Sequence, residues 1–278
     1  MIQPQGAKYR FGKETIEMLH GKKESTPGDL IEGVLSKHTL LDLKQLIQHT
    51  SLDEHVVKEA ITKGVEDRYL IEVSRQKYSL TKTFNKLKDE MTTQLEDYHQ
   101  TFPMRLGMSK AELVQLFSEI YQKSFVEYSL NQFVEDGDVQ KEEQFVSLAG
   151  FYPDLPKQWK QRMLEVIATL EKDGVSVKKW EEYVTDTPLS KVDANELAVY
   201  LVQTKQAYRF MEDRLIHQSA VDGALKTLRE QTNDTFGIKE AKDTLAVSRK
   251  YLIPFLELLD QLKITTRIED KRKWISQG

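Results

Sequence analysis

The sequence predicts a mainly helical protein with small β-hairpins, an α+β class in which one pattern is repeated four times. Apolar residues recur at three- and four-residue spacing in many separate segments, which is typical of helices that bury one face. Short runs rich in β-branched residues follow them in pairs separated by polar turns. The order helix, helix, helix, hairpin then recurs along the 278 residues.

The last copy shows the pattern most clearly. Helices are predicted around residues 219–234, 238–245 and 248–262, followed by a strand at 264–268 and a second strand that ends at Ile275. The third helix carries one apolar stripe for a core, formed by Tyr251, Phe255, Leu258, Leu259 and Leu262. The same order recurs upstream, so four domains are expected, at residues 1–78, 79–151, 152–217 and 218–278. The prolines expected to mark connections are Pro103, Pro153, Pro156 and Pro188.

Three helices followed by a two-stranded wing define the winged-helix variant of the helix-turn-helix. The sequence therefore predicts four tandem winged-helix domains in an elongated arm. An array of helical repeats whose hairpins are only loops is the alternative. The β-branched hairpin near the C-terminus argues against it.

Composition excludes several classes of protein. The chain has no cysteine, so disulfide scaffolds, thiolate metal sites and thiol nucleophiles are excluded, and a reducing compartment is indicated. The formal net charge is -4, so any surface that attracts nucleic acid must be local. Apolar runs long enough to span a membrane, and a secretory signal, are not found in the sequence. We expect a soluble cytoplasmic protein.

Motifs for catalysis are also missing from the sequence. The six histidines form no HExxH motif and no i,i+4 pair, and the chain has no GxSxG, GxGxxG or phosphate-binding loop. We therefore expect no enzymatic activity, no metal and no cofactor in this chain. Trp159 and Trp180 lie in helical patterns and are expected in a core, whereas Trp274 suits either packing or base stacking.

One segment near the C-terminus combines a helix start with basic residues. Ser248 is a candidate cap, and Arg249 and Lys250 then fall in the first helical turn, where the helix dipole disfavours cations. A phosphate bound there would remove that penalty. The wing that follows carries four more cations and two acidic residues between them. With Lys263, Glu257 and Asp260 included, the net charge from residue 247 onward is +3. An ordinary solvated wing is the alternative.

This segment resembles the C-terminal end of the bacterial selenocysteine-specific elongation factors. The family's Ser-Arg-Lys-Tyr helix start corresponds to residues 248–251, its Leu-Glu-x-x-Asp helix end to residues 256–260, and its wing pattern to residues 265–272. A second match, the family's His-x-x-x-Pro-x-x-x-Gly-Met link, falls at residues 99–108. Two positions depart from the family, because Glu269 replaces a usual Gly in the wing and Phe151 replaces a frequent His.

The resemblance implies that the chain binds the selenocysteine insertion (SECIS) hairpin of an mRNA. In that family, a GTPase body ahead of these domains delivers selenocysteinyl-tRNA to the ribosome at UGA, and GTP and Mg²⁺ belong to that body. Phosphate contacts are then expected from Ser248, Arg249, Lys250, Lys271 and Lys273, and base-edge contacts from Arg267, Asp270 and Arg272. We expect a monomer. The rival interpretation is a tandem winged-helix DNA-binding regulator or a protein-interaction scaffold.

Overall fold

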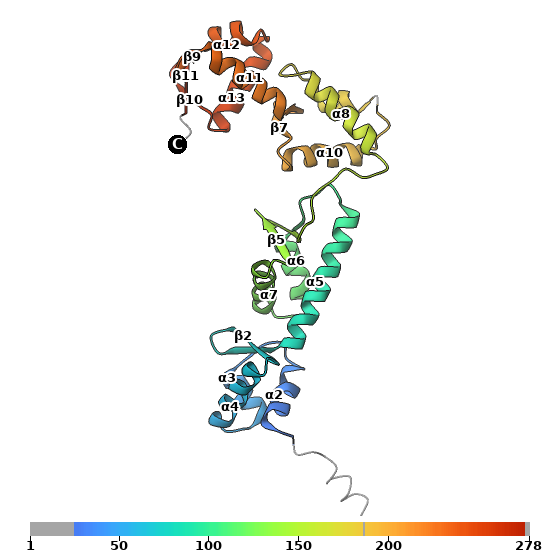
Figure 1. Ribbon diagram of the computed structural model, residues 1–278, viewed down its shortest axis with the longest axis vertical. Coiled ribbons are helices and arrows are strands. Elements are labelled where there is room, and N and C mark those ends of the chain that lie inside the picture. Colours follow the sequence, from blue (N-terminus) through green and yellow to red (C-terminus); the bar gives the residue numbers. More distant parts are fainter. Residues whose placement is uncertain (1–24, 186, 276–278) are drawn as a thin grey trace, which may run out of the picture. The chain divides into compact units, whose positions relative to one another are not determined.

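The computed structural model describes residues 25–185 and 187–275. Within these ranges the order of three helices followed by a β-hairpin occurs four times (Figure 1). The predicted fold class, mainly helical with small antiparallel sheets, is confirmed. The four prolines expected in connections all lie outside the helices and strands.

The first repeat adds a short strand to the predicted hairpin. Its elements are α2 (Pro27–Leu35), β1 (Leu41–Asp42), α3 (Leu43–Thr50), α4 (Glu54–Glu66), β2 (Leu70–Ser74) and β3 (Lys77–Leu80). β3 pairs with both β1 and β2 in an antiparallel sheet. Thr26 and Asp42 begin α2 and α3 in capping boxes with Asp29 and Gln45. The repeat encloses its own core, which includes Ile31, Leu46, Val57 and Leu70.

The second repeat contains the longest described helix, α5. Its elements are α5 (Thr81–Thr101), β4 (Met108–Ser109), α6 (Lys110–Ser118), α7 (Lys123–Glu135), β5 (Val139–Glu142) and β6 (Phe145–Leu148), and the sheet order is β4-β6-β5. Two contacts hold the link between α5 and β4 against β6. His99 Nε2 accepts a hydrogen bond from the Leu148 amide at 3.1 Å. Gly107 lies so close to Val146 that a Cβ there would be 2.3 Å from the carbonyl oxygen of Val146.

These contacts give the His-x-x-x-Pro-x-x-x-Gly-Met link a structural role. The His99 ring also stacks on Phe151, with ring centroids 3.6 Å apart and planes 8° from parallel. Burial lowers the pKa of His99 to about 4, so the ring is neutral at neutral pH. Phe151, the residue that departs from the family pattern, therefore packs on the histidine of the link.

The third repeat has a hairpin of two strands. Its elements are α8 (Lys160–Lys172), α9 (Trp180–Thr185), α10 (Lys191–Gln203), β7 (Ala207–Phe210) and β8 (Arg214–His217). The Trp180 indole donates a hydrogen bond to the Ala194 carbonyl at 3.1 Å. Trp180 and Trp159 both pack against the buried core, which confirms their predicted role.

The fourth repeat matches the predicted elements closely. It consists of α11 (Gln218–Gln231), β9 (Thr235–Gly237), α12 (Ile238–Leu245), α13 (Arg249–Gln261), β10 (Thr265–Ile268) and β11 (Lys271–Trp274). β11 lies between β10 and β9 in an antiparallel sheet. One cluster of buried side chains continues from the third repeat into the fourth, and includes Val166, Leu197, Leu228 and Leu252. The last two repeats therefore share a core.

All four repeats have a left-handed residue just after the third helix. Two residues beyond it, a residue adopts a left-handed conformation, with φ of 62°, 78°, 59° and 56° at Arg68, Gly137, Lys205 and Lys263. In the first, second and fourth repeats the next amide donates to a carbonyl five residues back, as from Ile264 to Leu259. This Schellman geometry turns the chain from helix to strand. A buried residue then begins each hairpin: Leu70, Val139, Ala207 and Thr265.

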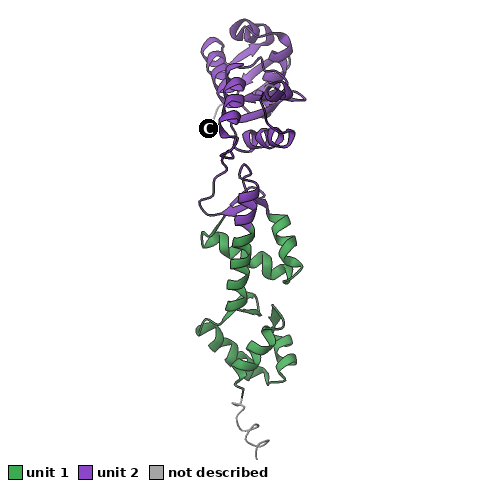
Figure 2. Cartoon of the chain, turned by 90° about the vertical axis from the view of Figure 1, so that its right-hand side faces the viewer, with its two compact units in different colours: residues 1–94, 110–139 green, residues 95–109, 140–278 purple. Residues whose placement is uncertain are grey.

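Clustering of contacts divides the chain into two compact units, residues 1–94 with 110–139 and residues 95–109 with 140–278 (Figure 2). This division cuts through the second repeat instead of separating four domains. By the order of elements, the first repeat ends at Leu80 and the third ends at His217. The expected first boundary, between residues 78 and 79, therefore lies two residues before the end of β3. None of the helices in the described part of the chain combines the length and apolar character needed to cross a membrane.

Candidate nucleic-acid interface

The start of α13 presents cations to solvent. Ser248 is the N-cap residue, with extended backbone angles, but its hydroxyl makes no capping hydrogen bond. Arg249 and Lys250 follow in the first turn, and both side chains are exposed. In the described ranges neither is ion-paired with a carboxylate. The helix dipole and the two side chains thus place positive charge at one exposed helix end.

The β10–β11 register sorts the wing residues onto two faces. Thr266 pairs with Lys273 and Ile268 with Lys271, and all four side chains are exposed. Neighbouring positions along each strand point to the opposite face. The outer face therefore carries Lys271 and Lys273, two of the residues expected to contact phosphates.

Arg272 lies on the inner face of the wing. It was expected to contact a base edge, which requires an exposed side chain. Its side chain is only 8% exposed, and its Nε donates to Asp260 Oδ2 at 2.9 Å. Thr265 Oγ1 donates to the other carboxylate oxygen of Asp260 at 2.6 Å. A guanidinium buried in such a network joins the sheet to α13 and is not presented to a ligand, so we omit Arg272 from the candidate interface.

Arg267, which pairs with Arg272 near the end of β10, and Asp270, in the turn of the wing, are both exposed. Arg267 Nε donates to the Glu269 carbonyl at 3.1 Å, which holds the guanidinium beside the turn. Glu269 has φ of 53°, a conformation that favours glycine. The turn therefore has a glycine-like backbone although the residue is Glu.

Trp274 packs against the fourth repeat. Its ring centroid lies 5.1 Å from that of Phe236, and the guanidinium carbon of Arg229 lies 5.0 Å from the indole. The Trp274 indole donates to Thr232 Oγ1 at 3.4 Å. These contacts favour packing over base stacking at this position.

Arg229, which lies outside the basic segment of the sequence, is also beside the wing. With Lys273 and Trp274 it lines an open hollow of about 890 Å³ at the base of the wing. Arg229 lies in α11, far from the basic segment in sequence, and only the fold brings it beside Lys273. In the described ranges, no three His, Asp or Glu side chains gather closely enough to hold a metal ion.

Comparison with known proteins relates two of the repeats to one family. Residues 92–148 and 228–274 match two family models, both described as "Elongation factor SelB, winged helix". The selenocysteine-specific elongation factor of Desulfomicrobium baculatum is 26% identical over 181 residues, which are 64% of this chain and 28% of that protein. The chain therefore spans less than a third of this relative's length.

Two solved structures are also similar. A crystal structure of the bacterial selenocysteine-specific elongation factor EF-Sec aligns with 95% of this chain and 40% of its own, with 22% identity and a TM-score of 0.49. The mRNA-binding domain of E. coli SelB in complex with SECIS RNA aligns with 45% of this chain and 98% of its own, with 12% identity and a TM-score of 0.34. Similarity at this level adds nothing to the family matches. Those matches cover residues 92–148 and 228–274 and support a C-terminal winged-helix region of the type found in elongation factor SelB.

Proposed function

We propose that this chain is the mRNA-binding part of a selenocysteine-specific elongation factor and that its last repeat binds a SECIS hairpin. The observation that carries the proposal is the set of exposed cations at the start of α13 and on the outer face of the wing: Arg249, Lys250, Lys271 and Lys273. No carboxylate in the described residues forms an ion pair with any of them.

An RNA hairpin suits such a surface. Side chains cannot enter the deep, narrow major groove of A-form RNA, so proteins bind its phosphates and the unstacked bases of its loop. In the proposed complex, the four exposed cations contact phosphates, and the free Ser248 hydroxyl and the amides of α13 bind one phosphate at the helix start. Arg267, exposed in β10, and Asp270, exposed at the turn, contact base edges, the carboxylate by accepting from guanine N–H groups.

The remaining partners belong to the full-length factor. We propose that the first three repeats connect this RNA-binding end to a GTPase body that uses GTP and Mg²⁺ and delivers selenocysteinyl-tRNA to the ribosome. The chain is proposed to act by recruitment as a cytoplasmic monomer, without chemistry of its own.

Capture of RNA from a bacterial lysate, followed by sequencing, tests the proposal. The immobilised full chain should enrich hairpins that lie next to in-frame UGA codons. The control is the variant R249Q/K271Q/K273Q, because deletion of the last repeat would open the core that it shares with the third. We expect the variant to lose the enrichment. Equal enrichment by both proteins, or preferential capture of duplex DNA, would contradict the proposal.

A further inference from the structure

The third repeat contributes an arginine to the start of α13. The guanidinium carbon of Arg214, the first residue of β8, lies 6.0 Å from the ring centroid of Tyr251 in α13. Lys250 Nζ lies 5.5 Å from the centroid of the same ring. Because the two repeats share one buried core, this junction belongs to a packed interface. Two cations from different repeats therefore meet one aromatic ring at the helix start.

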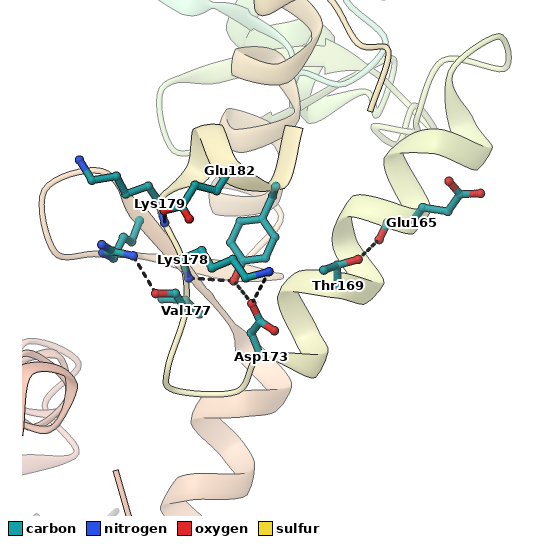
Figure 3. Close-up of polar contacts among 9 residues, drawn as sticks. Glu165, Thr169, Asp173, Val177, Lys178, Lys179 and Glu182 are labelled. Carbon is teal, nitrogen blue, oxygen red and sulfur yellow. Dashed lines mark hydrogen bonds and ion pairs between the residues drawn. The ribbon is translucent and has the colours of Figure 1, made fainter. Parts of the chain in front are cut away.

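The position of Arg214 is fixed by the loop between α8 and α9. Arg214 Nη1 donates to the Val177 carbonyl at 2.8 Å, and Val177 is fully buried. The same loop is held by Tyr183, whose hydroxyl donates to Asp173 at 2.7 Å and accepts from the Lys178 amide at 3.0 Å (Figure 3). Burial and the Asp173 carboxylate raise the pKa of Tyr183, so it remains a donor. The guanidinium is thus held in place before any ligand binds.

Neither cation at this junction forms an ion pair with a carboxylate in the described ranges. Asp213, next to Arg214 in the chain, pairs with Lys179 at 2.8 Å. This pair lowers the pKa of Asp213, and the charge of Arg214 lowers it further. Attraction to the ring face stabilises each cation, but the two cations repel each other. A bound phosphate would remove this repulsion and occupy the N–H groups of Arg214 that Val177 does not use.

We propose that the RNA backbone crosses this junction and that Arg214 of the third repeat is a further phosphate contact. This inference rests on the proposed function and extends the RNA surface from the last repeat to the last two. Arg214 was not singled out in the sequence, because it lies outside the basic segment and is brought to Tyr251 only by packing between repeats.

Filter binding of the full chain to the most enriched hairpin, at several salt concentrations, tests the inference. We expect Arg214→Ala to weaken binding about fivefold or more and to reduce the log-log salt slope by about 0.7 to 0.9, the value of one phosphate contact. Arg214→Gln, which keeps an amide N–H for Val177, should have the same effect if Arg214→Ala is unstable. Arg214→Lys should retain the wild-type slope.

Arg209→Ala is the matched control, because Arg209 is an exposed arginine on the neighbouring strand β7. It should leave affinity and slope unchanged. Unchanged affinity for Arg214→Ala and Arg214→Gln, or weaker binding with an unchanged slope, would overturn the inference while the proposed function stands. Failure of the wild-type chain to bind any hairpin would instead overturn both.

Discussion

Single residues in the wing divide into those that hold the domain together and those available to a ligand. Arg272 and Lys271 are neighbours in sequence and carry the same charge. The strand alternation nevertheless buries the guanidinium of Arg272 against Asp260 and leaves Lys271 on the outer face. Charge in the sequence therefore identifies a basic wing, but only the pairing of strands identifies which cations lie on its exposed outer face.

This division predicts different effects of two adjacent substitutions. Arg272→Ala should lower the free energy of unfolding by about 2–4 kcal/mol, because it leaves Asp260, 24% exposed, without its counter-ion. Lys271→Ala should change it by less than about 0.5 kcal/mol and weaken RNA binding instead. Urea denaturation of both variants measures the difference, and equal stabilities would contradict the assignment.

The left-handed Glu269 gives a second prediction. Glu269→Gly should raise the free energy of unfolding by up to about 1 kcal/mol, because glycine adopts φ of 53° without strain. It should also tighten RNA binding by removing a negative charge beside the cations. Glu143 has the same φ of 53° in the wing of the second repeat, so Glu143→Gly should give the same stability gain with unchanged RNA affinity. A loss of stability in both variants would refute the strain argument.

At the scale of elements, close backbone approach fixes the link into the second repeat. Gly107→Ala should destabilise the protein by about 1–3 kcal/mol, because the new Cβ would clash with the Val146 carbonyl. Gly223→Ala in α11 is the matched control, since a Cβ there meets nothing within 4 Å. It should stabilise the protein by about 0.5–1 kcal/mol through better helix propensity. Thermal unfolding measures both, and a stabilising Gly107→Ala would contradict the account.

The helices and hairpins were predictable because each carries a periodic pattern. α12 begins and ends at the predicted residues, and α13 differs from its prediction only because Ser248 and Leu262 are its caps. The strands β1, β4 and β9 were not predicted, because a strand of two or three residues is too short to show alternating apolar and polar side chains. The burial of Arg272 and the junction at Arg214 depend on contacts between distant segments, which a linear pattern does not contain.

At the scale of the whole molecule, the last two repeats share a core, whereas the first has its own. Leu197→Ala in α10 and Leu252→Ala in α13 should therefore lower the midpoint of the same calorimetric transition. Each should reduce the free energy of unfolding by about 2–5 kcal/mol, because both side chains are fully buried. Leu46→Ala, in the core of the first repeat, should shift a different transition. Separate transitions for Leu197→Ala and Leu252→Ala would show that the two repeats unfold independently.

The most direct test of the central claim is the salt dependence of hairpin binding by the intact chain. With phosphate contacts from Arg249, Lys250, Lys271 and Lys273, the log-log slope should be about -3 to -4, and replacing any one of these residues by alanine should reduce it by about 0.7 to 0.9. A wild-type slope near zero, or alanine variants that keep both slope and affinity, would contradict an RNA-binding surface formed by the start of α13 and the wing.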